Sequence, residues 1–208
     1  TAEYSASSAV TINLTAGTAF GGDAQNDVLI GIRYLTGSGQ ADLLTGDGND
    51  NLLNGGAGAD TLVGGAGADT LQGGGGAGDV ADYDASGGAV TVDLLAGTGT
   101  GGDAQGDILT NVANVRGTLL ADRISGDGNT NLLLGGYGAD TLGGGGGADT
   151  LMGGNDNDLL TGGAGADSID GGAGTNTLDY SGSTAVTVNL GSGTATGGDA
   201  AGDTFANI

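Results

Sequence analysis

The sequence contains no cysteine, proline, histidine or tryptophan, and only 3 of its 208 residues are basic. Without cysteine and histidine, disulfides, thiol catalysis, zinc sites and histidine acid–base chemistry are all excluded. The formal net charge of -22 argues against nucleic acid and anionic membrane surfaces as partners. No apolar run is long enough to span a bilayer, and these residues show no signal peptide or transit segment.

The acidic residues are almost all aspartate, because Glu3 is the only glutamate among the 25 acids. Aspartate suits turns, where its short side chain bonds nearby backbone, and the 51 glycines supply turns with positive φ. High glycine content with high net charge can also signal disorder. Here Leu, Ile and Val recur at fixed positions, so the order of the residues outweighs their composition.

A nine-residue repeat dominates the chain. Residues 55–63 read GGAGADTLV and residues 64–72 read GGAGADTLQ, both of the form G-G-x-G-x-D-x-U-x, where U is a large apolar residue. Five copies fill residues 37–82, the fifth with one extra residue, and seven fill residues 117–179. The U position holds Leu44, Leu53, Leu62, Leu71, Ile124, Leu133, Leu142, Leu151, Leu160, Ile169 and Leu178.

A second kind of segment, here called the spacer, flanks the two repeat blocks. Spacers occupy residues 1–36 and 83–116, and a third begins at residue 180 and runs to 208. Each contains a tyrosine followed by an alternating stretch (YSASSAVTINL, YDASGGAVTVDL and YSGSTAVTVNL) and then the letters GGDA. Alternation of period two predicts a strand with one buried face.

The tyrosines that open these stretches are Tyr4, Tyr83 and Tyr180, and we expect them to pack in the core or against a turn. They are separated by 79 and then 97 residues, a difference of 18. Since 18 residues are two nonapeptides, a pair of nonapeptides is expected to form one coil. The blocks and spacers are then one continuous solenoid.

Each nonapeptide is expected to spend about six residues on a turn and three on a short strand. Two strands of one coil then face each other, with the U side chains pointing inward. At the usual strand spacing of ~4.8 Å, about eleven coils form a rod on the order of 50–55 Å long. The sequence therefore predicts an all-β solenoid with a thin apolar core.

The turns of such a rod place an aspartate carboxylate every nine residues along each edge. Uncompensated, their repulsion amounts to several kcal/mol per turn at low effective dielectric, and three arginines are too few to offset it. Ca²⁺ takes six to eight oxygens from carboxylates and carbonyls, whereas Mg²⁺ prefers a small octahedron that keeps its waters. We therefore expect the chain to need Ca²⁺ in order to fold.

These repeats resemble the RTX (repeats-in-toxin) nonapeptide family, whose fold is a right-handed parallel β-roll or β-solenoid with Ca²⁺ between stacked turns. The resemblance implies roughly one ion per well-formed loop. The aspartate ligands it implies are Asp42, Asp60, Asp69, Asp122, Asp140, Asp149, Asp158 and Asp167. The carbonyl ligands it implies lie at Gly56, Gly58, Gly65, Gly67, Gly136, Gly138, Gly145, Gly147, Gly154, Gly163 and Gly165.

Several positions depart from that pattern. Asn51, Asn131 and Asn176 replace the aspartate, so sites there are expected to be weak or absent. Gly78 stands at the aspartate position of the irregular fifth repeat, and Asp156 replaces a loop glycine. In the spacers, six aspartates either bind further Ca²⁺ or cap a wider turn: Asp23, Asp27, Asp103, Asp107, Asp199 and Asp203.

No feature of the sequence supports catalysis, so we expect no enzyme in these residues. Our leading hypothesis is a structural segment of a larger secreted bacterial protein, such as a surface filament, surface layer or adhesin stalk. This hypothesis takes the sequence to start and stop inside a spacer unit, with self-association or continuation along a longer array. Alternatives are the RTX region of a secreted enzyme or toxin, and a module that binds carbohydrate or another copy of itself. The resemblance also implies type I secretion and folding outside the cell.

Overall fold

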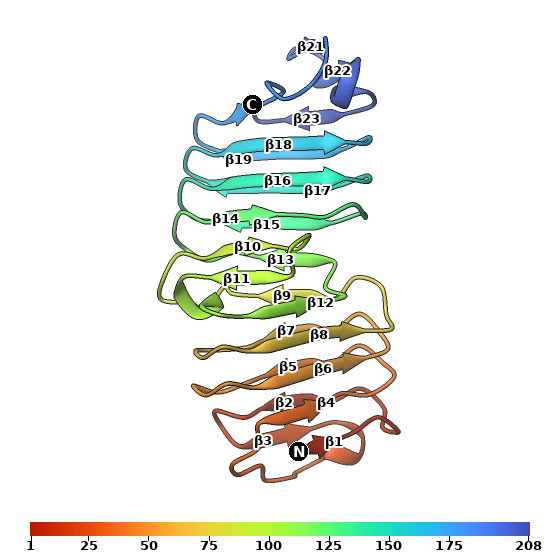
Figure 1. Cartoon of the computed structure of the whole chain (residues 1–208), viewed down its shortest axis with the longest axis vertical. Coiled ribbons are helices and arrows are strands. Elements are labelled where there is room, and N and C mark those ends of the chain that lie inside the picture. The colour runs from red at the N-terminus through yellow and green to blue at the C-terminus, as the bar shows by residue number, and fades with distance from the viewer.

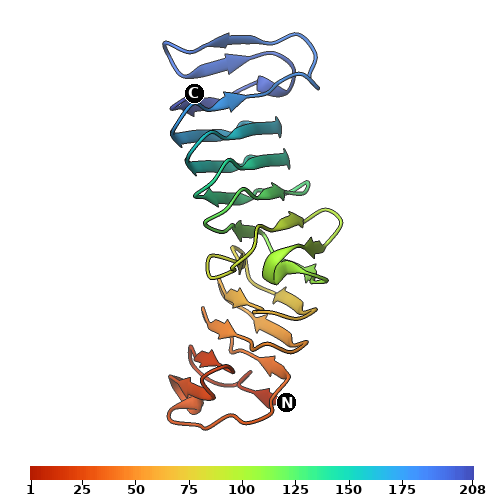
Figure 2. The same cartoon turned by 90° about the vertical axis from the view of Figure 1, so that its left-hand side faces the viewer.

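The computed structural model describes all 208 residues and shows an elongated stack of short strands, with the two termini near opposite ends (Figures 1 and 2). The strands form two sheets of 11 and 12 strands that face each other. The first sheet runs β1 (Ala2–Glu3), β4 (Tyr34–Thr36), β6 (Leu52–Gly56), β8 (Thr70–Gly74), β12 (Ile108–Thr110), β11 (Thr98–Thr100), β10 (Thr91–Asp93), β14 (Arg123–Ser125), β16 (Thr141–Gly146), β18 (Leu159–Ala164) and β20 (Thr177–Leu178).

The second sheet carries the alternate strands of each coil. Its order is β21 (Thr187–Asn189), β22 (Thr194–Thr196), β23 (Thr204–Ala206), β19 (Ser168–Ala173), β17 (Thr150–Asn155), β15 (Leu132–Gly136), β13 (Asn114–Arg116), β9 (Val80–Asp82), β7 (Thr61–Val63), β5 (Leu43–Thr45), β2 (Thr11–Asn13) and β3 (Thr18–Phe20). Three short 3₁₀ helices lie in the spacers: η1 (Gly22–Ala24), η2 (Gly102–Ala104) and η3 (Gly198–Ala200).

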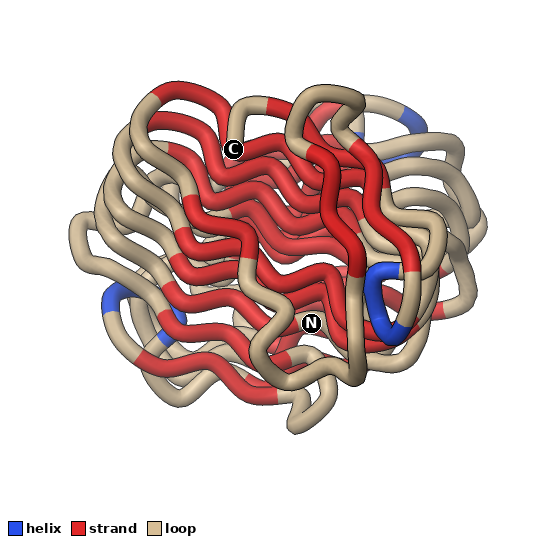
Figure 3. The backbone as a smooth tube through the Cα atoms, turned by 90° about the horizontal axis from the view of Figure 1, so that it is seen from above, coloured by secondary structure: helices blue, strands red, loops and turns tan.

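Within the blocks, strands pair in parallel at an offset of 18 residues, or of 19 between β7 and β9 at the irregular fifth repeat. Leu44 lies opposite Leu62 in one sheet, and Leu142 lies opposite Leu160 in the other. One coil is therefore two nonapeptides, and the predicted all-β β-roll is confirmed. Seen from above, the strands of successive coils lie over one another (Figure 3). The U side chains from Leu44 to Leu160 are fully buried in the core.

The central spacer differs from a pair of ordinary coils. β10 and β11 pair in antiparallel fashion, and β11 pairs in the same way with β12. β12 then lies beside β8, and β10 lies beside β14, so the hairpin is inserted into the first sheet. The second sheet passes directly from β9 through β13 to β15. The reversed strand β11 was not anticipated from the sequence.

The three spacer hairpins alternate between the sheets. β2 and β3 lie in the second sheet, β10 and β11 in the first, and β21 and β22 in the second again. Nonapeptides alternate between sheets, and each block holds an odd number of them. Successive spacers therefore meet the stack on opposite faces, and adding nonapeptides in pairs preserves this alternation.

Candidate metal centres

The aspartates of the nonapeptides form hydrogen-bonded ladders along both edges of the roll. The Oδ1 atom of each accepts a hydrogen bond from the backbone N–H at the same repeat position one coil earlier. Asp60 accepts from Asp42 at 2.8 Å, and Asp140 accepts from Asp122 at 2.7 Å. These bonds fix each carboxylate in the turn and leave its second oxygen, Oδ2, for another partner.

In six of these aspartates the Oδ2 atom is buried and has no hydrogen-bond partner. They are Asp60, Asp69, Asp140, Asp149, Asp158 and Asp167. None of the six residues is more than 2% exposed. A buried carboxylate oxygen without a partner is costly, and such groups are normally paired with a cation or neutralised by a proton.

Burial also changes the acidity of these groups. Desolvation raises the pKa of Asp69 and of Asp140 to about 7, and that of Asp60 and of Asp149 to about 6. Neighbouring carboxylates of the same edge add to the rise, while the backbone N–H bond opposes it. Without a bound cation, the folded turns therefore retain their protons to a higher pH than free aspartate does.

The first position of the repeat must be glycine, because these Oδ2 atoms leave no room there for a Cβ atom. A Cβ atom on Gly55 would lie less than 3.0 Å from Asp60 Oδ2 and 2.7 Å from the carbonyl oxygen of Gly73, one coil further on. A Cβ on Gly144 would collide in the same way with Asp149 Oδ2 and the carbonyl of Gly162. A carboxylate oxygen and a carbonyl oxygen of the next coil thus converge where only glycine leaves room.

All eleven glycines predicted to supply carbonyl ligands adopt positive φ, from 87° at Gly65 to 148° at Gly165. Asp156 adopts a φ of 76° in place of its loop glycine, so this substitution keeps the left-handed turn. The structure contains no cluster of three or more histidine, cysteine or acidic side chains. One carboxylate per loop with several carbonyls is an all-oxygen donor set, and it fits Ca²⁺.

The first loop on each edge of a block is built differently. Its second residue is Ser38, Asp47, Thr118 or Asp127 rather than glycine. The N–H of Ser38 donates to Asp42 Oδ2, and the N–H of Thr118 donates to Asp122 Oδ2 at 2.5 Å. Both carboxylates also accept the hydroxyl of the same residue. Asp42 and Asp122, predicted as ligands, are therefore fully hydrogen-bonded within the protein.

The asparagines of the ladders pair differently from one another. The Oδ1 atoms of Asn51 and Asn131 accept the N–H of Asp47 at 2.7 Å and of Asp127 at 2.9 Å. Asn176 instead accepts the Asp158 N–H and donates through Nδ2 to the carbonyl of Asn207. Its side chain thus bridges two coils without any charge.

The prediction for the irregular fifth repeat was wrong. Asp79, not Gly78, takes the aspartate position, since its Oδ1 accepts the N–H of Asp60 at 2.9 Å. The extra residue is accommodated inside the glycine-rich loop, where Gly78 adopts a φ of 92°. Asp79 is 1% exposed. A strict count of nine residues per repeat points to Gly78, because it does not allow for the inserted residue.

The spacer aspartates fall into two groups. Asp107 and Asp203 continue the ladders, accepting the N–H of Asp69 and of Asp167 at 2.9 Å. Their Oδ2 atoms accept the hydroxyls of Tyr83 at 2.9 Å and of Tyr180 at 2.7 Å.

Asp27 accepts the hydroxyl of Tyr4 in the same manner, at 2.9 Å. The other three aspartates, Asp23, Asp103 and Asp199, lie in the 3₁₀ turns, where their N–H groups donate to Ser7, Ser86 and Ser183. In each spacer the segment reads GGDA-x-x-D. The structure brings its second aspartate, and not its first, to the tyrosine of the same spacer.

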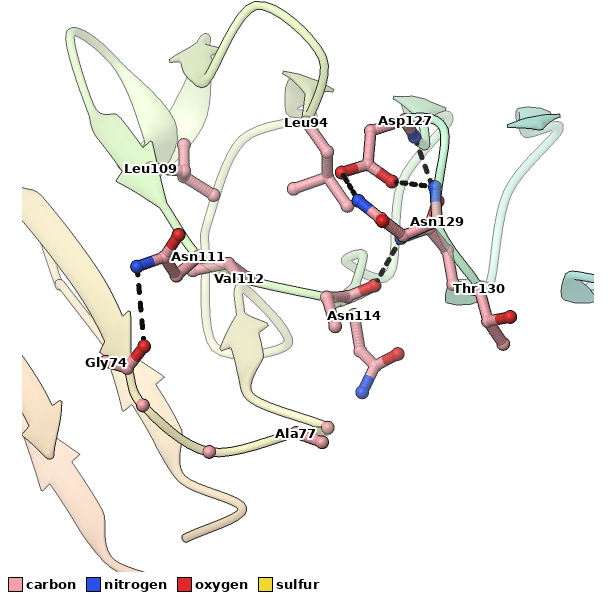
Figure 4. A pocket seen from close by; sticks show the side chains of 15 residues that line it. Gly74, Ala77, Leu94, Leu109, Asn111, Val112, Asn114, Asp127, Asn129 and Thr130 are labelled. Atoms are coloured by element: carbon pink, nitrogen blue, oxygen red, sulfur yellow. Dashed lines mark hydrogen bonds between the residues drawn. The ribbon is translucent and has the colours of Figure 1, made fainter. Parts of the chain in front are cut away.

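A cavity of about 770 Å³ lies at the central spacer (Figure 4). It opens where one ladder is interrupted, between the loop of residues 74–78 and the loop of residues 127–131. Its walls combine backbone and amide groups with the side chains of Leu94, Leu109 and Val112. Asn111 donates to the carbonyl of Gly74 at 3.4 Å, and Asp127 is held by Asn129 at 2.8 Å. Asp127 is its one acidic side chain, so it presents no carboxylate pair.

Comparison with known proteins agrees with this geometry. The model of one family, the RTX calcium-binding nonapeptide repeat, matches the chain in four copies, at residues 34–62, 54–79, 116–151 and 143–178. Together these matches span just over half of the chain and leave the spacers outside. No curated protein matches the chain. No helix of the structure is long and apolar enough to cross a membrane.

Proposed function

Because the chain belongs to the RTX calcium-binding nonapeptide repeat family, we propose that it is a calcium-folded rod within a larger secreted bacterial protein. Its blocks are a calcium-binding β-roll region, and no enzyme family is indicated. In this role the rod is a structural element of a surface filament, surface layer or adhesin stalk. Folding then takes place outside the cell, where calcium is abundant.

The observation that carries this proposal is the set of six buried Oδ2 atoms without a hydrogen-bond partner. Each lies beside glycines whose Cβ-free surface lets carbonyl oxygens approach. Ca²⁺ bound at these oxygens supplies the counter-charge that the chain lacks, since the only ion pair joins Arg116 to Asp82 at 3.6 Å. With the cation bound, stacked carboxylates no longer oppose folding.

Extracellular calcium modules bind the ion at roughly 10⁻⁴–10⁻³ M, far above resting cytosolic levels. Inside the cell the chain then remains unfolded through repulsion among its carboxylates, which suits passage through a narrow export channel. Each occupied site contributes RT ln(1 + [Ca²⁺]/Kd) to stability, so several modest sites act together. RTX repeat proteins are typically secreted, and we propose type I secretion for this chain.

The rod role is supported by the uniformity of the molecule. Two blocks and three spacers repeat one plan, and the cavity at the central spacer presents a single carboxylate, that of Asp127. Self-association of such rods, or their continuation along a longer array, belongs to the same proposal.

Circular dichroism of the purified chain tests the calcium requirement. We expect a strand spectrum in millimolar calcium and an unfolded spectrum after chelation at neutral pH, with recovery when calcium is restored. Magnesium at the same concentration serves as the control and is expected to restore little. A strand spectrum that survives chelation would refute the proposal.

A further inference from the structure

We infer that protein hydrogen bonds replace calcium in the first loop on each edge of a block and at Asp107 and Asp203, so that the spacers form metal-free junctions between calcium-filled columns. This inference rests on the proposed function, because it concerns which loops take the ion. It divides the predicted ligands into two sets. Interior aspartates offer a free Oδ2, whereas both oxygens are engaged by donors of the chain itself in four aspartates next to the spacers, Asp42, Asp107, Asp122 and Asp203.

The closing end of a column is formed by the spacer tyrosine. In the central spacer, Asp107 Oδ1 accepts the Asp69 N–H and its Oδ2 accepts the Tyr83 hydroxyl, each at 2.9 Å. Asp107 is 2% exposed and Tyr83 is 3% exposed, so neither oxygen relies on water. A hydroxyl bonded to a carboxylate is a strong, charge-assisted donor. It occupies the oxygen that is free in Asp69.

The bond from the tyrosine hydroxyl to an aspartate Oδ2 occurs in all three spacers. Tyr4 donates to Asp27 and Tyr180 donates to Asp203, each across 23 residues, compared with 24 for Tyr83 and Asp107. Each tyrosine therefore donates to the second aspartate of the GGDA-x-x-D segment in its own spacer. A residue that only filled space in the core would not need a hydroxyl aimed at the same atom three times.

The opening end of a column is formed by the second residue of the first loop. In interior loops this residue is a glycine with positive φ, such as Gly56 at 106° or Gly136 at 115°. Ser38 and Thr118 are not among the residues with positive φ, and their N–H groups point at the carboxylates of Asp42 and Asp122. In the opening loops a backbone N–H thus points at the Oδ2 atom, which has no partner in the interior loops.

The two opening loops that carry asparagine are closed in the same way, but the acceptor is a neutral amide instead of a carboxylate. The N–H of Asp47 donates to Asn51, and the N–H of Asp127 donates to Asn131. The Asp47 and Asp127 carboxylates are used locally, accepting from Asn49 and Asn129 two residues on. All four opening loops are therefore closed by hydrogen bonds, on both edges and in both blocks.

A calcium count on matched variants tests this division. In native mass spectrometry of the full chain at saturating calcium, Asp107→Asn and Asp122→Asn are expected to bind as many ions as the parent. Asp69→Asn and Asp140→Asn, one coil further into the blocks, are each expected to lose one ion. Loss of an ion from either terminal variant would overturn the inference.

The result also separates this inference from the proposed function. If neither Asp69→Asn nor Asp140→Asn loses an ion, calcium does not bind in the interior loops and the proposed function fails. If they lose an ion and the terminal variants do so as well, only the metal-free junction fails.

Ultraviolet titration of the tyrosines provides a second measurement that needs no variant. Tyr34 and Tyr137 are more than half exposed. In the calcium-loaded protein we expect the other three, Tyr4, Tyr83 and Tyr180, to remain un-ionised at about pH 11, because burial and the bond to an aspartate raise the pKa of each. Ionisation of all five there, while circular dichroism still shows the strand spectrum, would overturn the inference.

Discussion

The interior loops and the spacer turns carry the same aspartate in the same ladder, but they complete it in different ways. Asp69 and Asp107 are consecutive members of one ladder, joined by the Asp69 N–H. The Oδ2 of Asp69 has no partner, whereas that of Asp107 accepts the Tyr83 hydroxyl. The comparison teaches that a buried carboxylate does not by itself define a calcium site. What matters is whether the chain already supplies a donor to its second oxygen.

The difference also explains how a charged solenoid can be divided into blocks. A column of carboxylates depends on calcium along its whole length, and a spacer interrupts that dependence with neutral donors. The antiparallel hairpin of β10 and β11 adds further backbone hydrogen bonds at the same place. Each spacer is thus the part of the rod whose structure depends least on the ion.

The largest effect that separates the two regions should come from pH in the absence of calcium. The interior carboxylates have folded-state pKa values raised above 3.8, to about 7 for Asp69 and Asp140. Such groups contribute stability that is present at low pH and is lost as pH rises through the folded-state pKa. With chelator present, the strand spectrum should therefore be absent at pH 8 and partly regained near pH 5.

Circular dichroism at pH 5, 6, 7 and 8 without calcium checks this expectation. Calcium should restore the same spectrum at pH 8, because the cation and the proton neutralise the same oxygens. A metal-free chain that gains strand signal as the pH rises would contradict the assignment of these carboxylates. It would also remove the physical contrast between interior and spacer turns.

A methyl group placed in an interior loop should have the next largest effect. In Gly144→Ala the new Cβ collides with Asp149 Oδ2 and with the Gly162 carbonyl. Overpacking of this kind costs about 1–3 kcal/mol, and the loss of one ion adds RT ln(1 + [Ca²⁺]/Kd). The total destabilisation should therefore grow by about 1.4 kcal/mol for each tenfold rise in calcium above the Kd.

The neighbouring glycine gives a matched control for this substitution. A Cβ atom on Gly143 would meet no other atom within 4 Å, and Gly143 is not among the glycines with positive φ. Gly143→Ala should therefore leave stability and its calcium dependence close to those of the parent. Chemical denaturation of both variants at two calcium concentrations makes the measurement. Equal effects of the two substitutions would show that the glycine serves only chain flexibility.

Much of this architecture could be predicted from the sequence, because the repeat specifies both period and phase. Leu44 pairs with Leu62 as the two-nonapeptide coil requires, and Leu151 pairs with Ile169 in the same way. The interior aspartates also recur at one position of each turn, as the repeat predicts. Local period sufficed here because each coil contacts mainly its neighbours.

The spacers could not be predicted to the same depth. The alternation through Val90 and Val92 indicates a strand but not its partner, and β10 pairs with a strand 32 residues further on. Nor does the sequence show that Tyr83 reaches Asp107, because that contact depends on how the 3₁₀ turn folds back. In the fifth repeat, strict counting placed Gly78 where the inserted residue brings Asp79. Non-local pairing and a one-residue insertion thus mark where the prediction from period ends.

Removal of the spacer hydroxyl should have an intermediate effect that does not depend on calcium. Tyr83→Phe leaves Asp107 Oδ2 buried without its donor, which costs about 1–3 kcal/mol. Because no ion is lost, this cost should be the same at two saturating calcium concentrations, unlike that of Gly144→Ala. Tyr137→Phe, at an exposed tyrosine, is the control and should change stability little. A cost for Tyr83→Phe that rises with calcium would contradict the contrast.

The smallest effect, and the sharpest for the comparison, is expected from turning an opening loop into an interior one. Ser38→Gly removes the hydroxyl bond to Asp42 and allows the positive φ found at Gly56. Losing that bond costs about 0.5–1.5 kcal/mol at low calcium. Once the backbone N–H turns away, Asp42 Oδ2 lies near the carbonyl of Gly55, the same donor pair as in interior loops. The variant should then bind one more ion than the parent and recover its stability as calcium rises.

Ser38→Thr, which copies Thr118 of the other block, keeps both donors and should change neither the number of bound ions nor the stability. If Ser38→Gly gains no ion, the second loop residue does not decide between hydrogen bond and metal.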